Sequence, residues 1–442
     1  MEVTEGKASK RGRKQTLVLA LALSAAVVAL FCLVPVVMTP VLWLAVAFAA
    51  FVTSRYCLLS VVASFMRHKL AAEPGRRPSI AFVIPCLNEL PSLQHTVPAM
   101  AALRYDGELL LCYSCESAST DGSMDYLRDE AEKNPSRIHL IEKETRPGGR
   151  GAAIAYGLTH APRTDVVGFL DADHIVGQES LDEIARVFGA DDPPWIVQGV
   201  CATADESHNW LARLLTVERL WLERVELRVA TKLGGLSQFG GGQGFFRREL
   251  LDDPRFVVDG SMILDDTDLS CRLALAGHKV KFDQDITTKS REPETLTEFL
   301  DQRFRWGRGW VQLVPKYFVQ SFRCPGAPLA TRLALLSFVL TPLLAAWLYL
   351  SFLAGATALV PGLGVNMPIW LPAVGLLWPF ALGVGPFLSG VRPVRFYDVP
   401  LVLVGVPLLL YTYCWLVAVS VVDAFILRRK PSYAKTAKPE VK

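Results

Sequence analysis

Two aspartates separated by one alanine, Asp171 and Asp173, form the most chemically informative pair in this sequence. They follow the apolar run 166–170, which is short, continuous and rich in β-branched residues, as is typical of a buried strand in a parallel sheet. The carboxyl ends of such strands form the edge at which ligands bind in open α/β sheets. Two carboxylates at this spacing suit Mg²⁺ or Mn²⁺, with open positions left for substrate phosphates. An ordinary acidic turn is the alternative interpretation.

A second set of carboxylates, Asp265, Asp266 and Asp268, stands at the expected start of a helix that continues through Leu275. Acidic residues stabilise a helix N-terminus, and that is their ordinary role. In a domain that already carries a metal-type pair, they also suggest a general base, because an attacking hydroxyl must lose its proton as the new bond forms.

Two glycine-rich segments are candidate ligand loops. Residues 146–151 combine glycines, which let backbone approach a ligand, with Arg146 and Arg150, which can hold phosphate. The spacing is not that of a Walker loop, and a solvated turn is the alternative. Residues 239–246 hold four glycines in five successive positions, which indicates close approach of backbone to a bound group or, alternatively, a flexible turn.

Gln302, Arg305 and Trp306 have the spacing of one helical turn, so we expect them to share a helix face. An arginine can neutralise a diphosphate leaving group, and a tryptophan offers a flat apolar surface for a sugar ring. A basic and aromatic helix at a membrane interface is the alternative.

The elements that must position these residues alternate between strands and helices. We expect a strand at 80–84 that Pro85 ends, and a second strand at 109–113 followed by the polar turn 116–122. The helices are expected at 123–133, 152–160 and, as a long amphipathic helix, 205–233. This alternation favours a βαβ sheet.

The composition excludes some classes of protein. The net charge of +3 gives no reason to expect a nucleic-acid partner. Of the nine cysteines, Cys112 and Cys115 have C-x-x-C spacing, but no second pair follows, so we expect reduced thiols and no zinc site. Hydrophobic residues make up 51% of the chain and concentrate at its two ends, which indicates membrane segments.

The two apolar ends define the predicted domain organisation: a basic tail at 1–15, a transmembrane hairpin at 16–66 interrupted at Pro40, a cytosolic domain at 76–326, a transmembrane region at 327–428 and a basic tail at 429–442. Basic residues on both flanks of the hairpin place its ends in the cytoplasm. The last region has three apolar stretches, at about 331–359, 368–390 and 398–427. Three spans conflict with a cytoplasmic basic tail, and a helix broken near Pro342 would restore an even number.

Five motifs in this order resemble those of the membrane-embedded family 2 glycosyltransferases, which include cellulose, hyaluronan, chitin and poly-N-acetylglucosamine synthases. The motifs are Pro85–Glu89, Asp171–Asp173, the glycine-rich stretch ending at Phe246, Asp265–Asp268 and Gln302–Trp306. The resemblance covers about 78–312 and includes the flanking membrane segments. It implies a cytosolic α/β domain of the GT-A type, Rossmann-like, inserted between α-helical transmembrane segments.

The resemblance also implies a role for each motif. Asp266 would be the catalytic base, Asp173 would bind the metal together with Asp171, and Gln302, Arg305 and Trp306 would bind the diphosphate and the acceptor. The nucleotide sugar would be held by Pro85, Asn88, Glu89, Glu116, Arg150, Asp171 and Asp265. The sequence departs from the family where Glu116 replaces an aspartate, Leu87 an aromatic residue, Asp265 a glutamate and Arg150 a lysine.

The expected reaction is a single displacement that inverts the donor, a UDP-sugar or another nucleotide-diphosphate sugar, into a β-linkage with the help of Mg²⁺ or Mn²⁺. One reading is a processive polysaccharide synthase in which elongation is coupled to export. The other is a single transfer to a lipid acceptor. In both readings the chain is expected to be a multi-pass protein of the bacterial inner membrane with its catalytic domain in the cytosol.

Overall fold

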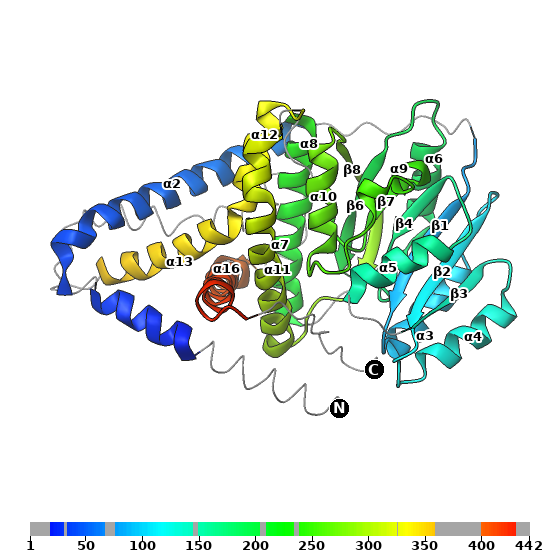
Figure 1. The fold of residues 1–442 in the computed structure, drawn as a ribbon, viewed down its shortest axis with the longest axis horizontal. Helices are drawn as coiled ribbons and strands as arrows, with labels where there is room; N and C mark the ends of the chain where they lie inside the picture. Colours follow the sequence, from blue (N-terminus) through cyan, green and yellow to red (C-terminus); the bar gives the residue numbers. More distant parts are fainter. Residues whose placement is uncertain are drawn as a thin grey trace.

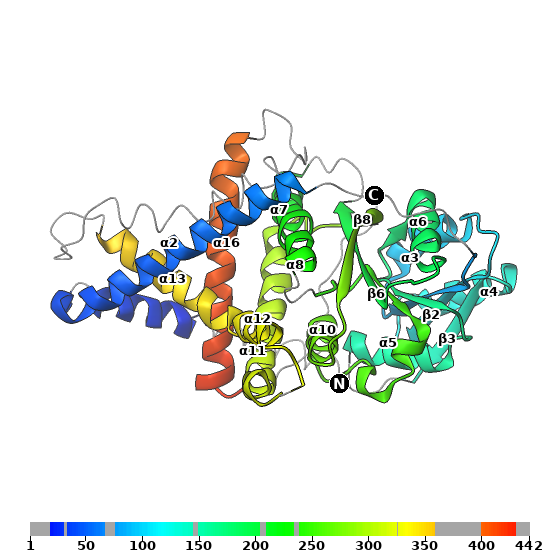
Figure 2. The same ribbon diagram turned by 90° about the horizontal axis from the view of Figure 1, so that it is seen from above.

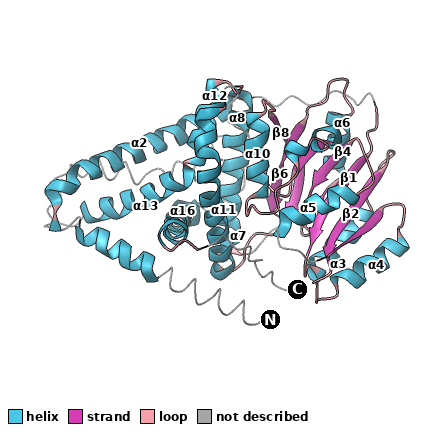
Figure 3. Cartoon of the chain, viewed as in Figure 1, coloured by secondary structure: helices cyan, strands magenta, loops and turns pink. Residues whose placement is uncertain are grey.

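The computed structural model describes the chain in eight stretches: residues 18–30, 33–66, 76–144, 149–203, 209–233, 238–324, 326–358 and 399–429. One half of the molecule is a sheet covered by helices, and the other half is helical (Figure 1, Figure 3). The predicted tail 1–15, the apolar stretch 368–390, the loop residues 146–148 and the tail beyond residue 429 lie outside the described residues.

The sheet has eight strands in the order β3-β2-β1-β4-β7-β6-β8-β5. In chain order the strands are β1 Ile80–Cys86, β2 Leu109–Glu116, β3 Ile138–Lys143, β4 Val166–Phe169, β5 Ile175–Val176, β6 Ile196–Thr203, β7 Gly244–Arg247 and β8 Val280–Ser290. Strands β1 to β4 pair in parallel, whereas β7 is antiparallel to both of its neighbours, β4 and β6. The sheet is therefore mixed rather than fully parallel.

Strand β1 is buried on both faces, which explains its continuous apolar sequence. Phe82 and Ile84 belong to the hydrophobic core on one face, and Ala81 and Val83 to the core on the other. The prediction that Pro85 ends this strand is wrong, because Pro85 is paired with Ser114 of β2. Pairing of β1 with β4 stops at Val83, so β1 is an edge at Pro85 and tolerates a residue without an N–H.

Two sets of helices cover the sheet. Helices α3 (Leu90–Ala101), α4 (Ser123–Lys133) and α6 (Gln178–Phe188) supply side chains to one core. Helices α5 (Gly149–His160), α9 (Arg248–Leu251) and α10 (Asp265–Leu275) supply the other, with the short helix η2 (Pro254–Phe256) beside them. The expected bounds of α4 are confirmed, and α5 begins three residues earlier than expected. The result is a three-layer α/β/α arrangement, as the alternating elements predicted.

The predicted long amphipathic helix is one continuous helix with three parts: α7 (Trp210–Trp221), the π-helical turn η1 (Leu222–Leu227) and α8 (Arg228–Leu233). It begins at residue 210 because the Asn209 side chain accepts hydrogen bonds from the N–H groups of Leu211 and Ala212, which caps the N-terminus. In both orientations this helix lies between the sheet and the apolar helices (Figure 1, Figure 2).

The helical half contains the helix Val18–Leu30, α2 (Pro35–Phe65), α11 (Leu296–Arg323), α12 (Leu329–Val339), α13 (Thr341–Ala358), α16 (Val399–Val421) and the π-helical turn η4 (Val422–Ile426). The expected interruption at Pro40 is wrong: Pro40 lies inside α2, and the chain leaves the helical conformation at Val34 instead. Helices α12 and α13 are bent by 48° relative to each other, close to the predicted break at Pro342.

Within the described residues, one helix, Leu403–Ile426, is long and apolar enough to cross a bilayer. The bent pair α12 and α13 would supply a second span if the two helices cross together. The apolar segments Val18–Leu30 and Ala50–Phe65 are shorter than a membrane span. The described residues thus contain one or two candidate spans, whereas the sequence predicts several.

Candidate functional site

Asp171 and Asp173 lie in the turn between β4 and β5, at the carboxyl end of a strand as expected. β4 is the point at which the sheet changes from parallel to antiparallel pairing. The turn is held from both sides, because the Thr96 hydroxyl of α3 donates to the carbonyl oxygen of Ala172 at 2.9 Å and the His174 N–H donates to the carbonyl oxygen of Asp171 at 2.9 Å. The two carboxylates thus leave a fixed backbone at a break in the sheet.

Arg150 joins three of the predicted motifs. Its guanidinium donates to Asp171 Oδ1 at 2.6 Å and to Asp265 Oδ2 at 2.6 Å, and a third bond goes to the carbonyl oxygen of Gly241. The side chain stands on the first turn of α5, while its partners come from the β4–β5 turn, from α10 and from the glycine-rich loop. Sequence reasoning expected Arg150 to face a phosphate, and the structure shows it neutralising neighbouring carboxylates.

The same arginine lowers the pKa of all three nearby carboxyls, but it outweighs burial only at Asp171. Burial opposes ionisation of Asp171, but Arg150 holds the pKa of that carboxyl below its usual range. Burial raises the pKa of Asp265 to about 7, with Arg150 opposing the shift and Asp266 adding to it. Burial also raises the pKa of Asp266 above its usual value, although Arg150 again opposes the shift. A carboxylate with a raised pKa is well matched to proton abstraction near neutral pH.

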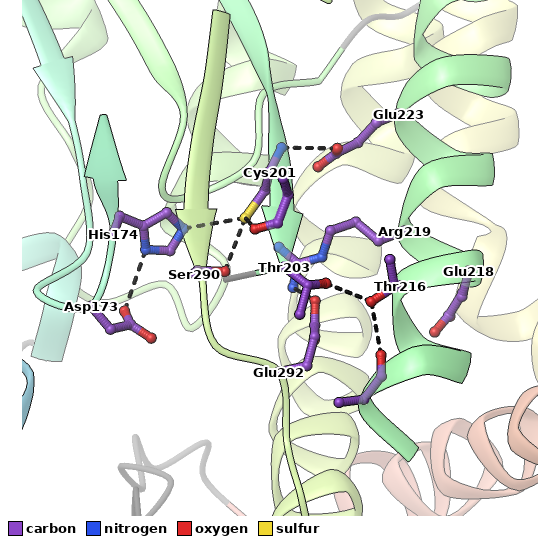
Figure 4. Close-up of polar contacts among 12 residues, drawn as sticks. Asp173, His174, Cys201, Thr203, Thr216, Glu218, Arg219, Glu223, Ser290 and Glu292 are labelled. Atoms are coloured by element: carbon purple, nitrogen blue, oxygen red, sulfur yellow. Dashed lines mark hydrogen bonds and ion pairs between the residues drawn. The ribbon is translucent and has the colours of Figure 1, made fainter. Parts of the chain in front are cut away.

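A cluster of three side chains has the spacing of a metal site. Asp171, Asp173 and His174 each offer one ligand atom, and these atoms lie within 4.8 Å of one another. The His174 ring has Nδ1 3.3 Å from Asp173 Oδ1 and Nε2 3.6 Å from the sulfur of Cys201, so its orientation is fixed (Figure 4). The two carboxylates are the donors that fit Mn²⁺ or Mg²⁺, and the imidazole lies beside them as a third polar group. Sequence reasoning missed His174, although it directly follows the acidic pair.

The side chains expected to hold the nucleoside lie at the ends of β1 and β2. Glu89 and Glu116 are buried, and Glu116 pairs with the buried Lys143 at 3.3 Å, a partner that sequence reasoning did not find. Asn88, by contrast, makes a contact between loops. Its side-chain oxygen accepts a hydrogen bond from the Thr120 N–H at 2.7 Å, so this amide joins the loops that follow the two strands.

Helix α11 carries Gln302, Arg305 and Trp306 and begins with a capping box formed by Thr295 and Glu298. The Gln302 Oε1 atom is buried and has no hydrogen-bond partner within the described part of the chain. A buried acceptor without a partner is costly, so its presence favours a role in binding a ligand.

Arg303, which sequence reasoning also missed, packs against Trp306 of the same helix. It is buried and donates to both carboxylate oxygens of Glu218 on α7, at 3.1 and 2.5 Å. Its guanidinium carbon lies 4.5 Å from the ring centroid of Trp306. The Trp306 ring therefore stacks against a cation that a second helix fixes.

One cavity of about 1480 Å³ connects these groups. It is lined by every residue predicted for the site except Asn88: Pro85, Glu89, Glu116, Arg150, Asp171, Asp173, Asp265, Asp266, Gln302, Arg305 and Trp306. The cavity continues between the apolar helices, where Phe48 and Phe51 of α2, Leu344 of α13 and Leu410 of α16 line it. The volume exceeds the ~300–1,000 Å³ of a typical small-ligand pocket, so there is room for a second substrate beside the first.

The helix α7–η1 connects this site to the apolar helices. Glu223 of η1 is buried and accepts a hydrogen bond from the Cys201 N–H of β6 at 2.9 Å (Figure 4). It accepts a second from the Gln243 side chain of the glycine-rich loop, also at 2.9 Å. Two residues earlier, Trp221 donates from Nε1 to the Ser60 hydroxyl of α2 at 3.3 Å. Two residues within one turn of this helix thus contact an apolar helix and the glycine-rich loop.

Comparison with known families identifies the class. The family described as "Glycosyltransferase like family 2" matches residues 78–309, more than half of the chain. The chain therefore belongs to glycosyltransferase family 2, and it is a glycosyltransferase.

Among curated proteins, "Poly-beta-1,6-N-acetyl-D-glucosamine synthase" of Staphylococcus aureus is 26% identical over 250 residues, which cover 57% of this chain and 59% of that protein. "Probable glycosyltransferase YdaM" of Bacillus subtilis is 24% identical over 247 residues, which cover 56% of this chain and 58% of that protein. The matched region thus spans less than two thirds of the length of each relative.

Among solved structures, a mannosyltransferase from Pyrobaculum calidifontis, in complex with GDP-Man and Mn²⁺, superposes with a TM-score of 0.59 at 21% identity, over 87% of this chain and 99% of that one. At this identity the likeness concerns the fold, which is a GT-A-like α/β fold with a mixed sheet.

Proposed function

We propose that this glycosyltransferase moves a sugar from a nucleotide-diphosphate sugar, a UDP-sugar in the first instance, onto a growing β-linked polysaccharide. Synthesis would be processive and coupled to export across the membrane. The observation that carries the proposal is the single cavity that runs from the acidic cluster, past Trp306, to the space between α2, α13 and α16. A product that lengthens by one sugar at each transfer needs such a continuous path.

In the proposed reaction Asp266 acts as the general base. An acceptor hydroxyl oxygen attacks the anomeric carbon of the donor sugar, and its proton passes to the Asp266 carboxylate. The bond between the anomeric carbon and the diphosphate oxygen breaks, and the nucleoside diphosphate leaves with the bonding electrons. One displacement of this kind inverts an α-linked donor into a β-linkage. The raised pKa of Asp266 supports this role, because burial makes its carboxylate a stronger base.

The remaining residues would bind and orient the substrates. Asp171, Asp173 and His174 would hold Mg²⁺ or Mn²⁺, which when bound neutralises charge on the leaving diphosphate. Gln302 has a buried carbonyl oxygen that a hydroxyl or N–H of a substrate could satisfy.

At the nucleoside end of the cavity, Pro85, Glu89 and Glu116 would contact the donor, and Asn88 would act by holding the adjoining loop. Arg305 and Trp306 would face the diphosphate and the acceptor sugar. These assignments rest on the positions of the residues around one cavity and on the family's motifs.

We further propose that the chain is a multi-pass membrane protein with its GT-A domain at 76–326 on the cytosolic side, in a bacterial inner membrane. The support comes from large apolar side chains that are exposed on α2 and α16, including Leu44, Phe51, Leu58, Val404 and Leu408. Exposed apolar surface of this extent is favourable against lipid and unfavourable in water.

A second candidate function is a single transfer to a lipid acceptor. It is favoured by Phe51 on α2, which both lines the cavity and is largely exposed, so that the cavity wall and the outer apolar surface share a side chain. A lipid-linked acceptor could approach from that side. Both functions use the same carboxylates, and they differ in the length of the product.

Product size is the decisive experiment. The purified chain in lipid is incubated with each common radiolabelled nucleotide sugar, beginning with UDP-N-acetylglucosamine in view of the Staphylococcus relative, with Asp266→Asn as the inactive control. High-molecular-weight product that a specific glycosidase digests would support the polymer synthase. Label found only in an organic-extractable lipid would refute it in favour of the glycolipid function.

A further inference from the structure

The glycine-rich loop that precedes β7 packs against both the proposed base and the proposed metal site. The Gly241 carbonyl oxygen accepts a hydrogen bond from Arg150, and a methyl group at Gly241 would come within 3.2 Å of Asp266 Oδ2. A methyl group at the next residue, Gly242, would overlap the ring of His174. The position of this backbone therefore affects where the base stands relative to the acidic cluster of the β4–β5 turn.

Hydrogen bonds hold the two ends of the loop. At its start, the Phe239 N–H donates to the Ser270 hydroxyl oxygen at 3.1 Å, and the next N–H along the chain donates to Gln198 Oε1 at 2.8 Å. At its end, the Gln243 side chain donates from Nε2 to Glu223 Oε1 at 2.9 Å. The two glycines that touch the site thus lie between anchored ends.

The contact between Gln243 and Glu223 is a buried hydrogen bond to a carboxyl group. The exposed fractions of the two residues are 5% and 3%. The other oxygen of Glu223 accepts from the Cys201 N–H of β6 at 2.9 Å, so the strand orients the carboxyl group that holds the loop. Because no water can replace a partner in this position, loss of the bond would leave a buried polar group unpaired and favour a shift of the loop end.

We propose that Glu223 is a positioning residue for sugar transfer: through Gln243 it fixes the glycine-rich loop, and the loop fixes Asp266 relative to the metal site. The inference rests on the proposed role of Asp266 as the base. Transfer requires the base within hydrogen-bond reach of the acceptor hydroxyl while the diphosphate is held at the metal. A shift of about 1 Å in such an arrangement can lower kcat by about a hundredfold.

Exchange of the two side chains tests the proposal with little change in volume. Gln243→Glu alone sets two carboxyl groups against each other and should lower kcat by about ten- to a hundredfold. The donor KM should change little, since the nucleoside is expected at the ends of β1 and β2. Adding Glu223→Gln should restore most of kcat, because the new amide donates to the carboxylate at position 243 while its oxygen still accepts from the Cys201 N–H.

Two further variants separate the hydrogen bond from other effects. Gln94→Glu adds the same charge at an exposed position of α3 and should leave kcat unchanged. Gln243→Leu should lower kcat as Gln243→Glu does, but Glu223→Gln should not rescue it, because leucine offers no acceptor. Each kcat is measured with UDP-N-acetylglucosamine and an oligosaccharide acceptor, well below the Tm of the variant, so that unfolded protein does not contribute.

Hydrogen exchange of the loop amides gives a readout that needs no substrate. Exchange in the segment 239–243 should be faster in Gln243→Glu and return to the wild-type rate in the double variant. The same pattern in a chain whose wild type transfers no sugar would refute the proposed function and leave the anchoring of the loop intact. Unchanged loop exchange or wild-type kcat in Gln243→Glu would overturn the proposal. So would a loss of kcat that the side-chain exchange fails to restore, which would indicate that Glu223 contacts the substrate directly.

Discussion

The buried pair between Arg303 and Glu218 gives the sharpest prediction. The pair joins α11 to α7, and only 8% of the Arg303 side chain and 19% of the Glu218 side chain are exposed. Glu218→Gln keeps the shape of the side chain and one hydrogen-bond acceptor but removes the charge. Arg303 would then be a buried cation without a counter-charge beside the Trp306 ring.

The size of the effect follows from the cost of breaking a buried pair, which is about 3–5 kcal/mol when one partner is removed. Since the glutamine keeps one acceptor, we expect a loss near the lower limit, about 3 kcal/mol. At roughly 2–4 °C per kcal/mol for a domain of this size, the Tm should fall by about 6–12 °C. Because Trp306 loses a fixed stacking partner, the KM for an oligosaccharide acceptor should rise about tenfold, whereas hydrolysis of the donor should change little.

The assays are thermal unfolding, acceptor-dependent transfer and acceptor-independent release of nucleoside diphosphate, each compared with Glu132→Gln, an exposed change of the same type. The double variant Arg303→Met with Glu218→Leu should recover most of the Tm, because an apolar pair replaces two charges. It should not recover acceptor binding, since the cation under the ring is gone. A Glu218→Gln protein with unchanged Tm and acceptor KM would refute the reasoning.

Four further predictions concern the catalytic cavity. Asp266→Asn should abolish transfer while donor binding, measured by calorimetry, persists; turnover like that of the wild type would remove Asp266 as the base. Since burial raises the pKa of Asp266, kcat/KM should begin to fall on acidification at a higher pH than an ordinary aspartate would give, and a profile that stays flat until the ordinary aspartate range would argue against a titrating base there. Transfer should stop in excess chelator and return with Mg²⁺ or Mn²⁺, and Asp173→Asn should raise the metal concentration required. Arg150→Met should lower the Tm most at neutral pH and least in acid, because protonation neutralises the carboxylates it leaves unpaired; a deficit independent of pH would contradict this.

Elements whose formation depends on their own local sequence were predicted well. The helix α4 has the bounds that its sequence predicts, and the apolar run at 166–170 supplies β4, Val166–Phe169, with Asp171 two positions beyond its end. The sequence did not predict that β7 inserts antiparallel between β4 and β6. Strand direction depends on which strand edges pair and not on any residue of Gly244–Arg247. Pro85 was misjudged for the same reason: whether a strand tolerates proline depends on where its neighbour stops.

The predicted and the missed residues of the site differ in the same way. Motif residues such as Asp173 and Trp306 were expected because their types and spacing are informative on their own. The groups that contact them, His174, Lys143 and Arg303, were missed. Lys143 and Arg303 act with partners 27 and 85 positions away, and His174 is held by the distant Cys201 as well as by its neighbour Asp173. The role of Arg150 was also incomplete, because its carboxylate partners are 21 and 115 positions away.

The continuous helix α7–η1–α8 has a mechanical consequence. Within two residues it bonds to Ser60 of α2 through Trp221 and to the glycine-rich loop through Glu223, so α2 cannot tilt without pulling on the wall of the catalytic cavity. In a bilayer, the tilt of an apolar helix follows the thickness of the lipid around it. The length of the surrounding acyl chains should therefore act on turnover as a physical variable, without any molecule bound to the enzyme.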